Sequence, residues 1–395
     1  MEDLLIKSIL DNDMYKFNIQ NFYIKNYCDA EAIFIFNNRD KTMKYTQTAF
    51  DELRHQVNLM SNLRLTNDEY DFMKKKVYYL DDSYFQYLSS FRHNPSQVKM
   101  ELSEEGDLKI KIIGKLRDAS MWEIPLMALI SEIYFKYVDK DWVIDDKRQI
   151  NIAKEKAKKL SDNDCKVADF STRRRRDFNS QNIAVNVMSK YPAFVGTSNP
   201  YLAMIYDLVP IGTIAHEVIM AISVLESLNH PNKYAMQKWL DTFGANLGIF
   251  LPDTYGINSF LNDFNTLFAK AFDGLRWDSG DYKEFTDKIV NHYKKLRINP
   301  MTKTITYSDS LDVDKYIEID KYCKGKILSL AGIGTNFSND YLKPDGTKSK
   351  AMNMVIKLDE VNGKKVCKLP DTPTKAIGDN TSIKIMKHLH FGESL

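Results

Sequence analysis

Hydrophobic and polar positions follow two different patterns along the chain. In the first 125 residues a helical pattern over residues 4–27 precedes an alternating run at 30–36, a helical pattern at 46–60 and another alternating run at 109–113. Alternation with a period of two is typical of strands that bury one face. This part of the chain is therefore predicted to be a mixed α/β unit.

From about residue 165 to 340, short apolar runs each end in a polar or glycine-rich cluster, and a helical stretch follows. The runs occupy residues 167–170, 193–195, 247–251, a weaker segment before 276, 304–307 and 327–330. This order predicts repeated β/α units with parallel strands, as in an irregular, TIM-like α/β barrel. Such a barrel places the loop after every strand at one mouth, so the polar clusters are expected to converge there.

The last fifty residues return to alternation, with a hairpin predicted at 353–358 and 364–369 around the turn Asn362-Gly363. So short a segment makes a poor independent domain, so we expect it to pack on the first region. The predicted organisation is an N-terminal α/β domain at 1–130, an α/β barrel domain at 131–345 and a C-terminal segment at 346–395. The N- and C-terminal segments together would form the second α/β domain.

Composition excludes several classes of protein. The 395 residues are 44% hydrophobic and 27% charged, an ordinary globular balance, and 55 basic against 53 acidic residues give a net charge of +2. No overall field therefore attracts nucleic acid or anionic lipid. The most apolar window, residues 201–225, is interrupted by charged residues, proline and glycine, so no membrane span is expected. Four separated cysteines without a CxxC motif, and a start unlike a signal peptide, predict a cytoplasmic protein.

Four consecutive arginines, residues 173–176, follow the first apolar run. Alternate residues of an extended segment point to opposite sides, so only one or two of them could face a site. One interpretation is a solvated surface run with exposed ion pairs, and another is a clamp for an anion, since guanidinium binds phosphate and carboxylate through paired hydrogen bonds. Nucleic-acid binding through the run is disfavoured by the flanking aspartates and the balanced charge.

His216 lies in the first turn of a predicted helix whose apolar face comprises positions 218, 221, 222, 225 and 228. The positive end of the helix dipole stabilises a negative group at this place, although a lone histidine here is more often a core or capping residue and gains significance only from its neighbours. Asp253 and Asp278 each follow an apolar run, where a carboxylate can bind ribose hydroxyls or Mg²⁺, or simply cap a helix. A Gly-x-Gly-Thr sequence at 332–335 follows the last run and offers backbone N–H groups to a phosphate.

Taken in order, these clusters closely resemble the nicotinate phosphoribosyltransferase family. The resemblance is carried by residues 11–16 (DNDMYK), 169–175 (DFSTRRR), 196–199 (GTSN), 212–217 (GTIAHE), 253–256 (DTYG), 276–281 (RWDSGD) and 332–336 (GIGTN). It implies synthesis of nicotinate mononucleotide and pyrophosphate from nicotinate and 5-phosphoribosyl 1-pyrophosphate, with Mg²⁺ and with ATP hydrolysis driving the step, in NAD biosynthesis. It also implies an irregular α/β barrel with a second domain built from both chain ends, and a homodimer with shared active sites.

The resemblance further implies roles for individual residues. His216 would be phosphorylated by ATP, and Phe170 would stack on the pyridine ring opposite Tyr15 of the partner subunit. Asp253 would lie near pyrophosphate and the metal, and Asp278 would bind ribose hydroxyls. The remaining substrate-binding residues would be Arg173, Ser198, Arg276, Ser308, Asp309, Gly332, Gly334 and Thr335. Arg39 and Lys16, from the other subunit, would meet ATP or pyrophosphate.

Three alternatives stay open at this point. A nicotinamide phosphoribosyltransferase would carry an aspartate near the Gly-Thr motif, where this chain has Ser198 and Asn199. A quinolinate phosphoribosyltransferase would lack the phosphorylated histidine motif. A non-catalytic phosphate-binding barrel would not need His216, Asp253 and Asp278 together.

Overall fold

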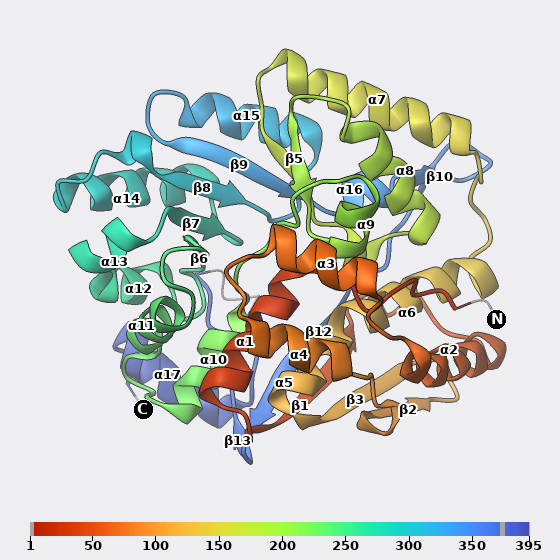
Figure 1. The fold of residues 1–395 in the computed structure, drawn as a ribbon, viewed down its shortest axis with the longest axis horizontal. Coiled ribbons are helices and arrows are strands. Elements are labelled where there is room, and N and C mark those ends of the chain that lie inside the picture. Colours follow the sequence, from red (N-terminus) through yellow and green to blue (C-terminus); the bar gives the residue numbers. More distant parts are fainter. Residues whose placement is uncertain (1–3, 372–375, 395) are drawn as a thin grey trace.

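Two large sheets organise the fold, which a computed structural model describes for residues 4–371 and 376–394 (Figure 1). A six-stranded sheet has the order β5-β4-β9-β8-β7-β6, and a five-stranded sheet has the order β13-β12-β1-β3-β2. A third, two-stranded sheet pairs β10 (Tyr341–Leu342) with β11 (Lys348–Ser349).

The six-stranded sheet is parallel throughout, and its strands coincide with the predicted apolar runs. They are β4 (Val167–Asp169), β5 (Phe194–Thr197), β6 (Ile249–Phe250), β7 (Gly274–Trp277), β8 (Thr304–Tyr307) and β9 (Leu328–Ile333). The α/β architecture with a parallel sheet is therefore confirmed. The strand order leaves β5 and β6 at the two edges, and no ladder joins these edges within the described residues, so the closed barrel stays a prediction.

The five-stranded sheet is antiparallel and combines strands from both ends of the chain. Its members are β1 (Glu31–Asn38), β2 (Val98–Leu102), β3 (Leu108–Lys115), β12 (Met354–Val361) and β13 (Lys364–Lys365). β12 lies between β13 and β1, with Phe34 opposite Leu358 and Phe36 opposite Ile356. These four side chains are buried, which fixes the register because a slip of one residue would turn them to the other face. The domain boundaries at residues 130 and 345 stay predictions.

Helices cover both sheets. Those before β4 are α1 (Met14–Asn26), α2 (Gln47–Leu59), α3 (Asn67–Lys76), α4 (Asp82–Ser90), α5 (Leu116–Ala119), α6 (Glu123–Tyr137) and α7 (Asp146–Asp162). Those after it are α8 (Phe178–Met188), α9 (Pro200–Ile205), α10 (His216–Leu225), α11 (Pro231–Phe243), α12 (Ile257–Asp263), α13 (Thr266–Ala271), α14 (Tyr282–Lys295), α15 (Val313–Cys323), α16 (Thr335–Ser338) and α17 (Asn380–Phe391). In the described ranges, no helix has the length and apolar character needed to cross a bilayer.

The first helix begins at Met14, so the helix predicted from residue 4 was wrong over its first ten positions. Short polar side chains explain the difference. Ser8 Oγ accepts from the backbone N–H of Leu10, and Asn12 Oδ1 accepts from the N–H of Asp13. Such local bonds offer the backbone an alternative to helix. The segment before α1 consequently forms a loop that reaches the ends of the parallel strands.

Candidate active site

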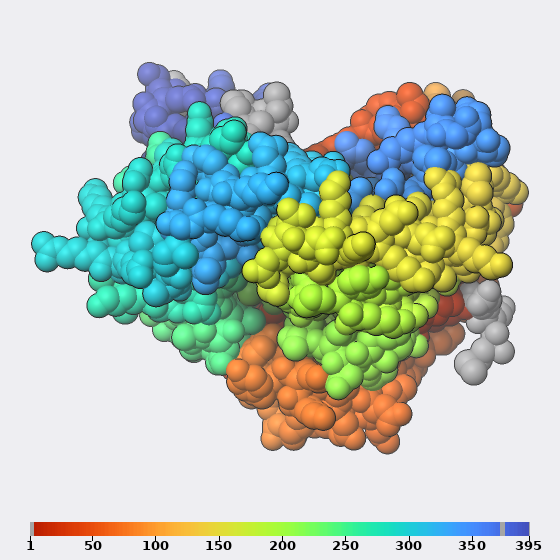
Figure 2. Space-filling view, turned by 90° about the horizontal axis from the view of Figure 1, so that it is seen from above, coloured from red at the N-terminus to blue at the C-terminus, as the bar shows by residue number. Residues whose placement is uncertain are grey.

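A cavity of about 770 Å³ lies where the parallel strands end and the antiparallel sheet begins. Thirteen of the predicted residues line it: Tyr15, Arg39, Phe170, Arg173, Ser198, His216, Arg276, Asp278, Ser308, Asp309, Gly332, Gly334 and Thr335. Lys348 and Ile377 also line it, and Figure 2 shows the surface hollowed between α17 and the β10–β11 segment that carries Lys348. The expected convergence of the clusters is therefore observed.

His216, the first residue of α10, has partners on both ring nitrogens. Its Nδ1 lies 3.0 Å from Thr254 Oγ1, and its Nε2 lies 3.0 Å from Asp278 Oδ2 and 3.5 Å from Asp253 Oδ1. Lys368 Nζ lies 2.7 Å from the same Nε2 and within 4 Å of both carboxylates. An imidazole, two carboxylates and an ammonium thus form one cluster at the cavity wall.

The charges of this cluster follow from burial and from its partners. Burial lowers the pKa of the His216 imidazole, and Lys368 lowers it further against the opposing effect of the carboxylates. Burial alone would raise the pKa of Asp278, but Arg276, His216 and Lys368 hold it well below its ordinary value. The pKa of Asp253 is likewise lowered, because Lys368 and His216 outweigh its burial. At neutral pH the imidazole is neutral and both carboxylates are ionised.

The cluster also has the composition of a cation site. Ligand atoms of His216, Asp253 and Asp278 all lie within 4.8 Å of one another. Asp253 is buried, and its Oδ1 has no hydrogen-bond partner, while Oδ2 accepts from Ser279 Oγ at 2.7 Å. Two carboxylates, one with a free oxygen, fit Mg²⁺, which prefers oxygen ligands. Asp253 itself lies behind the cavity wall and not among its lining residues.

The four arginines divide into two pairs. Thr172–Arg174 is a turn of 3₁₀ helix, and Arg173 and Arg174 line the cavity. Arg175 and Arg176 are fully buried in the protein body. Arg175 pairs with Asp11, whereas Arg176 stacks on Phe135, so the alternation of an extended segment does not describe the run. The interpretation as a solvated surface run was therefore wrong. Nucleic-acid binding through this run required arginines on the outer surface, so that interpretation loses its residues as well.

Phe170 and Tyr15 mark one end of the cavity. A Cβ atom at position 332 would lie 2.1 Å from Cδ2 of Phe170, so the ring occupies space that only glycine leaves free. Tyr15 is the second residue of α1, whose start is fixed by a 2.6 Å hydrogen bond from Met14 N to Ser198 O. Ser198 Oγ in turn donates to Asp13 Oδ1 at 2.6 Å. The loop after β5 thereby positions the start of α1.

Tyr15, Arg39 and Lys16, which the resemblance assigns to the partner's active site, have defined positions within their own chain. Tyr15 and Arg39 line the cavity of their own chain, because α1 and β1 pack directly against the parallel-sheet loops and β12. Lys16 is fully buried, with Nζ 2.5 Å from carboxylate oxygens of both Glu123 and Glu217. Burial alone would lower the pKa of its ammonium, but the two glutamates raise it. Lys16 is thus held between two carboxylates inside its own chain and does not line the cavity, and its contact with ATP or pyrophosphate of the other subunit stays a prediction.

Sequence reasoning missed several cavity residues, chiefly Asp13, Lys357 and Lys368. Asp13 places a carboxylate beside Ser198; burial raises its pKa, and the Ser198 hydroxyl and Arg173 lower it in part. Lys357 lies on β12, and its burial, with Arg39 and Lys368 nearby, lowers its pKa to about 7. Alternation in the predicted hairpin puts Lys357 on the face opposite Ile356 and Leu358, but the sequence does not show what that face contacts. Lys368 lies beyond β13 and has no such signal.

Known proteins share both the sequence and the fold of this chain. Residues 165–393 match the nicotinate phosphoribosyltransferase (NAPRTase) family, and residues 10–131 match its N-terminal domain. A nicotinate phosphoribosyltransferase of Methanosarcina mazei is 37% identical over 401 residues, covering 98% of both chains. One of Saccharomyces cerevisiae is 38% identical over 411 residues, covering 98% of this chain and 95% of the relative.

Solved structures agree with these relatives. A crystal structure of a Saccharomyces cerevisiae protein superposes with a TM-score of 0.94 at 37% identity, covering 98% of this chain and 99% of the other. The nicotinate phosphoribosyltransferase of Porphyromonas gingivalis gives 0.92 at 31% identity, covering 97% and 99%. Together with the cavity and the order of its motifs, these similarities show that the chain belongs to the nicotinate phosphoribosyltransferase family.

Proposed function

We propose that the protein joins nicotinate to 5-phosphoribosyl 1-pyrophosphate, giving nicotinate mononucleotide and pyrophosphate in NAD biosynthesis and salvage. One observation carries the proposal. A single cavity contains an aromatic pair, a Gly-x-Gly-Thr loop and a cluster of histidine, carboxylates and lysine, in a chain whose relatives bear this enzyme's name.

The aromatic end of the cavity suits the pyridine acid. In the proposal the ring lies between Phe170 and Tyr15, and its carboxylate meets Arg173 and the hydroxyl of Ser198. The guanidinium of Arg173 faces the cavity, where it can form a charge-assisted pair. Asp13 adds a carboxylate at the same end, so nicotinamide, whose amide donates hydrogen bonds, is the second candidate substrate.

The strand ends suit the sugar phosphate. Gly332, Gly334 and Thr335 would seat the 5-phosphate, since glycine lets the backbone N–H groups approach closely. Ser308 and Asp309 lie along the same wall. Asp278, which accepts from Ser308 Oγ at 3.2 Å and lies 3.5 Å from Arg276, would bind the ribose hydroxyls.

The reaction then requires positioning and charge, without a covalent nucleophile from the protein. The ring nitrogen of nicotinate attacks C1 of the ribose as pyrophosphate leaves, through a transition state with oxocarbenium character. Arg276 and Arg174, which both line the cavity, would offset the growing negative charge of the leaving group. Mg²⁺, held by Asp253 and Asp278, would supply further neutralisation of that charge. Stacking and ribose contacts align the two reactants.

His216 would couple the reaction to ATP. Its imidazole is neutral, so a nitrogen lone pair can accept the γ-phosphoryl group while ADP leaves. The added phosphate would lie at the start of α10, where the helix dipole favours negative charge, and next to Lys368. Arg39 and Lys357 line the cavity nearby and could bind the polyphosphate of ATP.

Three finer predictions belong to the same proposal. We retain a barrel-like closure of the parallel sheet, a cytoplasmic location and a homodimer. Because Tyr15 and Arg39 already line the cavity of their own chain, each protomer of such a dimer would bind nicotinate with its own residues.

One assay tests the proposed function. The purified protein is incubated with 5-phosphoribosyl 1-pyrophosphate, Mg²⁺ and either nicotinate or nicotinamide, with and without ATP, and the mononucleotide is identified by mass. Formation of nicotinate mononucleotide, faster with ATP, is expected. Exclusive formation of nicotinamide mononucleotide would transfer the assignment to the second candidate, and no product from either would reject both.

A further inference from the structure

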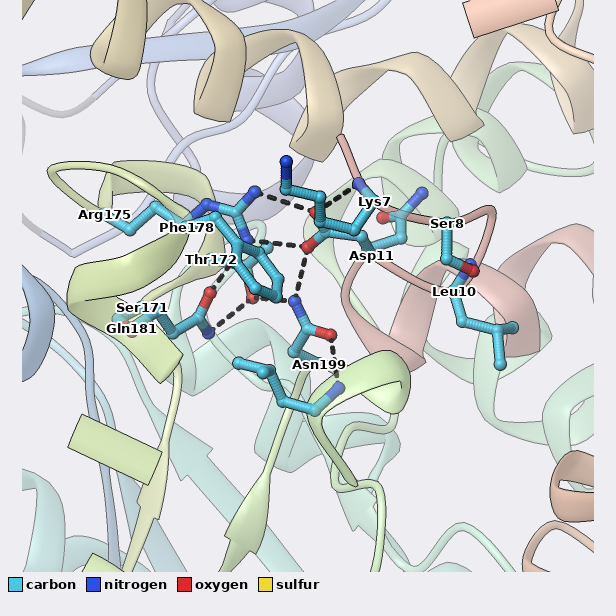
Figure 3. A network of polar contacts seen from close by, with 12 residues as sticks. Lys7, Ser8, Leu10, Asp11, Ser171, Thr172, Arg175, Phe178, Gln181 and Asn199 are labelled. Carbon is cyan, nitrogen blue, oxygen red and sulfur yellow. Dashed lines mark hydrogen bonds and ion pairs between the residues drawn. The ribbon is translucent and has the colours of Figure 1, made fainter. Parts of the chain in front are cut away.

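A buried polar network joins the segment before α1 to the segments after β4 and β5 (Figure 3). At its centre Arg175 NH1 donates to Asp11 Oδ1 at 2.6 Å, and NH2 donates to Asp11 Oδ2 at 2.8 Å. Neither side chain is exposed to solvent. Asn199 Nδ2 donates to Asp11 Oδ1 at 2.8 Å, and Gln181 Oε1 accepts from Arg175 NH1 at 3.1 Å. The network is thus a forked ion pair with an amide on each side.

The network joins the three loops that carry the proposed nicotinate ligands. Asp11 lies in the loop that leads to Asp13 and Tyr15, and Asn199 directly follows Ser198. Arg175 ends the turn that begins after Phe170 and contains Arg173. Gln181 Nε2 ties the network to this turn a second time, through a 3.0 Å bond to Thr172 Oγ1. Side chains that face the cavity and side chains that face the network therefore share the same short segments.

The energetics of the pair favour a role in geometry over one in stability. Burying two charges costs hydration free energy, and their mutual attraction barely offsets that cost. Well-packed apolar residues therefore often stabilise such a site equally well. The forked geometry, by contrast, fixes distance and angle between two backbone segments, which a single contact does not. Arg175 Nε has no hydrogen-bond partner, so the whole interaction depends on the two terminal nitrogens.

We infer that Asp11 and Arg175 are positioning residues for nicotinate: their ion pair sets the spacing between Tyr15, at the start of α1, and Phe170 and Arg173, in the segment after β4. Neither residue lines the cavity. The inference rests on the proposed function. A displacement of about 1 Å can cost on the order of a hundredfold in rate or binding. A weakened pair should therefore impair the use of nicotinate more than the use of 5-phosphoribosyl 1-pyrophosphate.

Adjacent Arg176 supplies a matched control. It is equally buried, stacks on the ring of Phe135 with Cζ 3.6 Å from the centroid, and donates to Ser349 Oγ at 3.0 Å. Among the described residues, its side chain has no polar contact with residues 11–15 or 198–199. Arg175→Lys and Arg176→Lys both retain a positive charge and lose the planar guanidinium group. They should lower the melting temperature to a similar extent, so stability alone cannot separate them.

Steady-state kinetics separate the two variants. We expect Arg175→Lys to raise the KM for nicotinate at least about tenfold, with a KM for 5-phosphoribosyl 1-pyrophosphate within about twofold of wild type, and Arg176→Lys to leave both unchanged. Asp11→Asn, nearly isosteric, should reproduce the Arg175→Lys effect and decides the matter if Arg175→Lys does not fold. The inference would be overturned if Arg175→Lys, or Asp11→Asn in its place, had the same nicotinate KM as Arg176→Lys. Inactive wild-type protein would instead reject the proposed function.

Discussion

The substitution Gly332→Ala tests whether the ring of Phe170 must lie where it does. A Cβ atom at this position would be 2.1 and 2.2 Å from two ring carbons, whereas ordinary contact begins at 3.4 Å. The ring or the strand must therefore shift by about 1.3 Å, the difference between 3.4 and 2.1 Å. Overpacking of this kind typically costs about 1–3 kcal/mol of stability. Because Phe170 would stack on nicotinate, its displacement should also raise the nicotinate KM by about tenfold to a hundredfold.

Gly114→Ala is the control: Gly114 lies on β3 of the antiparallel sheet, and the three atoms nearest to its Cβ would all belong to the side chain of Gln97. The measurements are thermal unfolding and the separate KM values for nicotinate and 5-phosphoribosyl 1-pyrophosphate. We expect a raised nicotinate KM in the position-332 variant alone. The KM for 5-phosphoribosyl 1-pyrophosphate should rise in the same variant, because Gly332 also belongs to the loop proposed to seat the 5-phosphate. A wild-type nicotinate KM in Gly332→Ala would refute the stacking role of Phe170.

Three further predictions concern the cations and the histidine. His216→Ala should retain ATP-independent synthesis and lose the stimulation by ATP, measured as product formed with and without ATP; equal stimulation in variant and wild type would reject the phosphohistidine. Lys368→Met should raise the pKa of the His216 imidazole, followed by NMR titration, and lower the free energy of unfolding by about 1–3 kcal/mol, because the buried carboxylate of Asp253 and the partly exposed one of Asp278 lose a cation; an unchanged imidazole pKa would contradict this. Lys357 loses its charge above its pKa of about 7, so wild type should bind pyrophosphate progressively more weakly than Lys357→Arg as pH rises from 6 to 8.5, by calorimetry. A ratio of the two affinities that does not change with pH would show that Lys357 does not meet the anion.

The parallel strands could be predicted because burial on both faces leaves a continuous apolar run. In β8 the sequence Thr-Ile-Thr-Tyr at 304–307 carries no charge, and its last three residues are all buried. The convergence of the clusters then followed from the rule that parallel strands place their following loops at one edge. The place of each residue shortly after an apolar run was enough to predict that Phe170, His216 and Asp278 lie at the same site, and all three line the cavity.

Charged residues with distant partners could not be predicted in this way. In the sequence, Lys16 looks like a lysine that could bind phosphate. Only the fold brings Glu123 and Glu217 to its ammonium group. The directions of the Arg173 and Arg175 side chains likewise depend on a turn of 3₁₀ helix, which the sequence of residues 172–174 does not predict. Lys368 lies beyond the short strand β13, in a segment predicted as regular hairpin. Its place beside His216 depends on how the chain returns after β12.

The position of β12 between β13 and β1 has a consequence for synthesis of the protein. β1 (Glu31–Asn38) pairs with a strand that is far later in the chain, so this sheet cannot be completed until β12 (Met354–Val361) has been synthesised. Lys357 and Lys368 arrive at the cavity only with that partner. Nascent chains should consequently remain inactive until β12 has been synthesised, and a premature stop between β9 and β12 should yield a polypeptide in which the strands of the parallel core are complete but one wall of the catalytic chamber is missing.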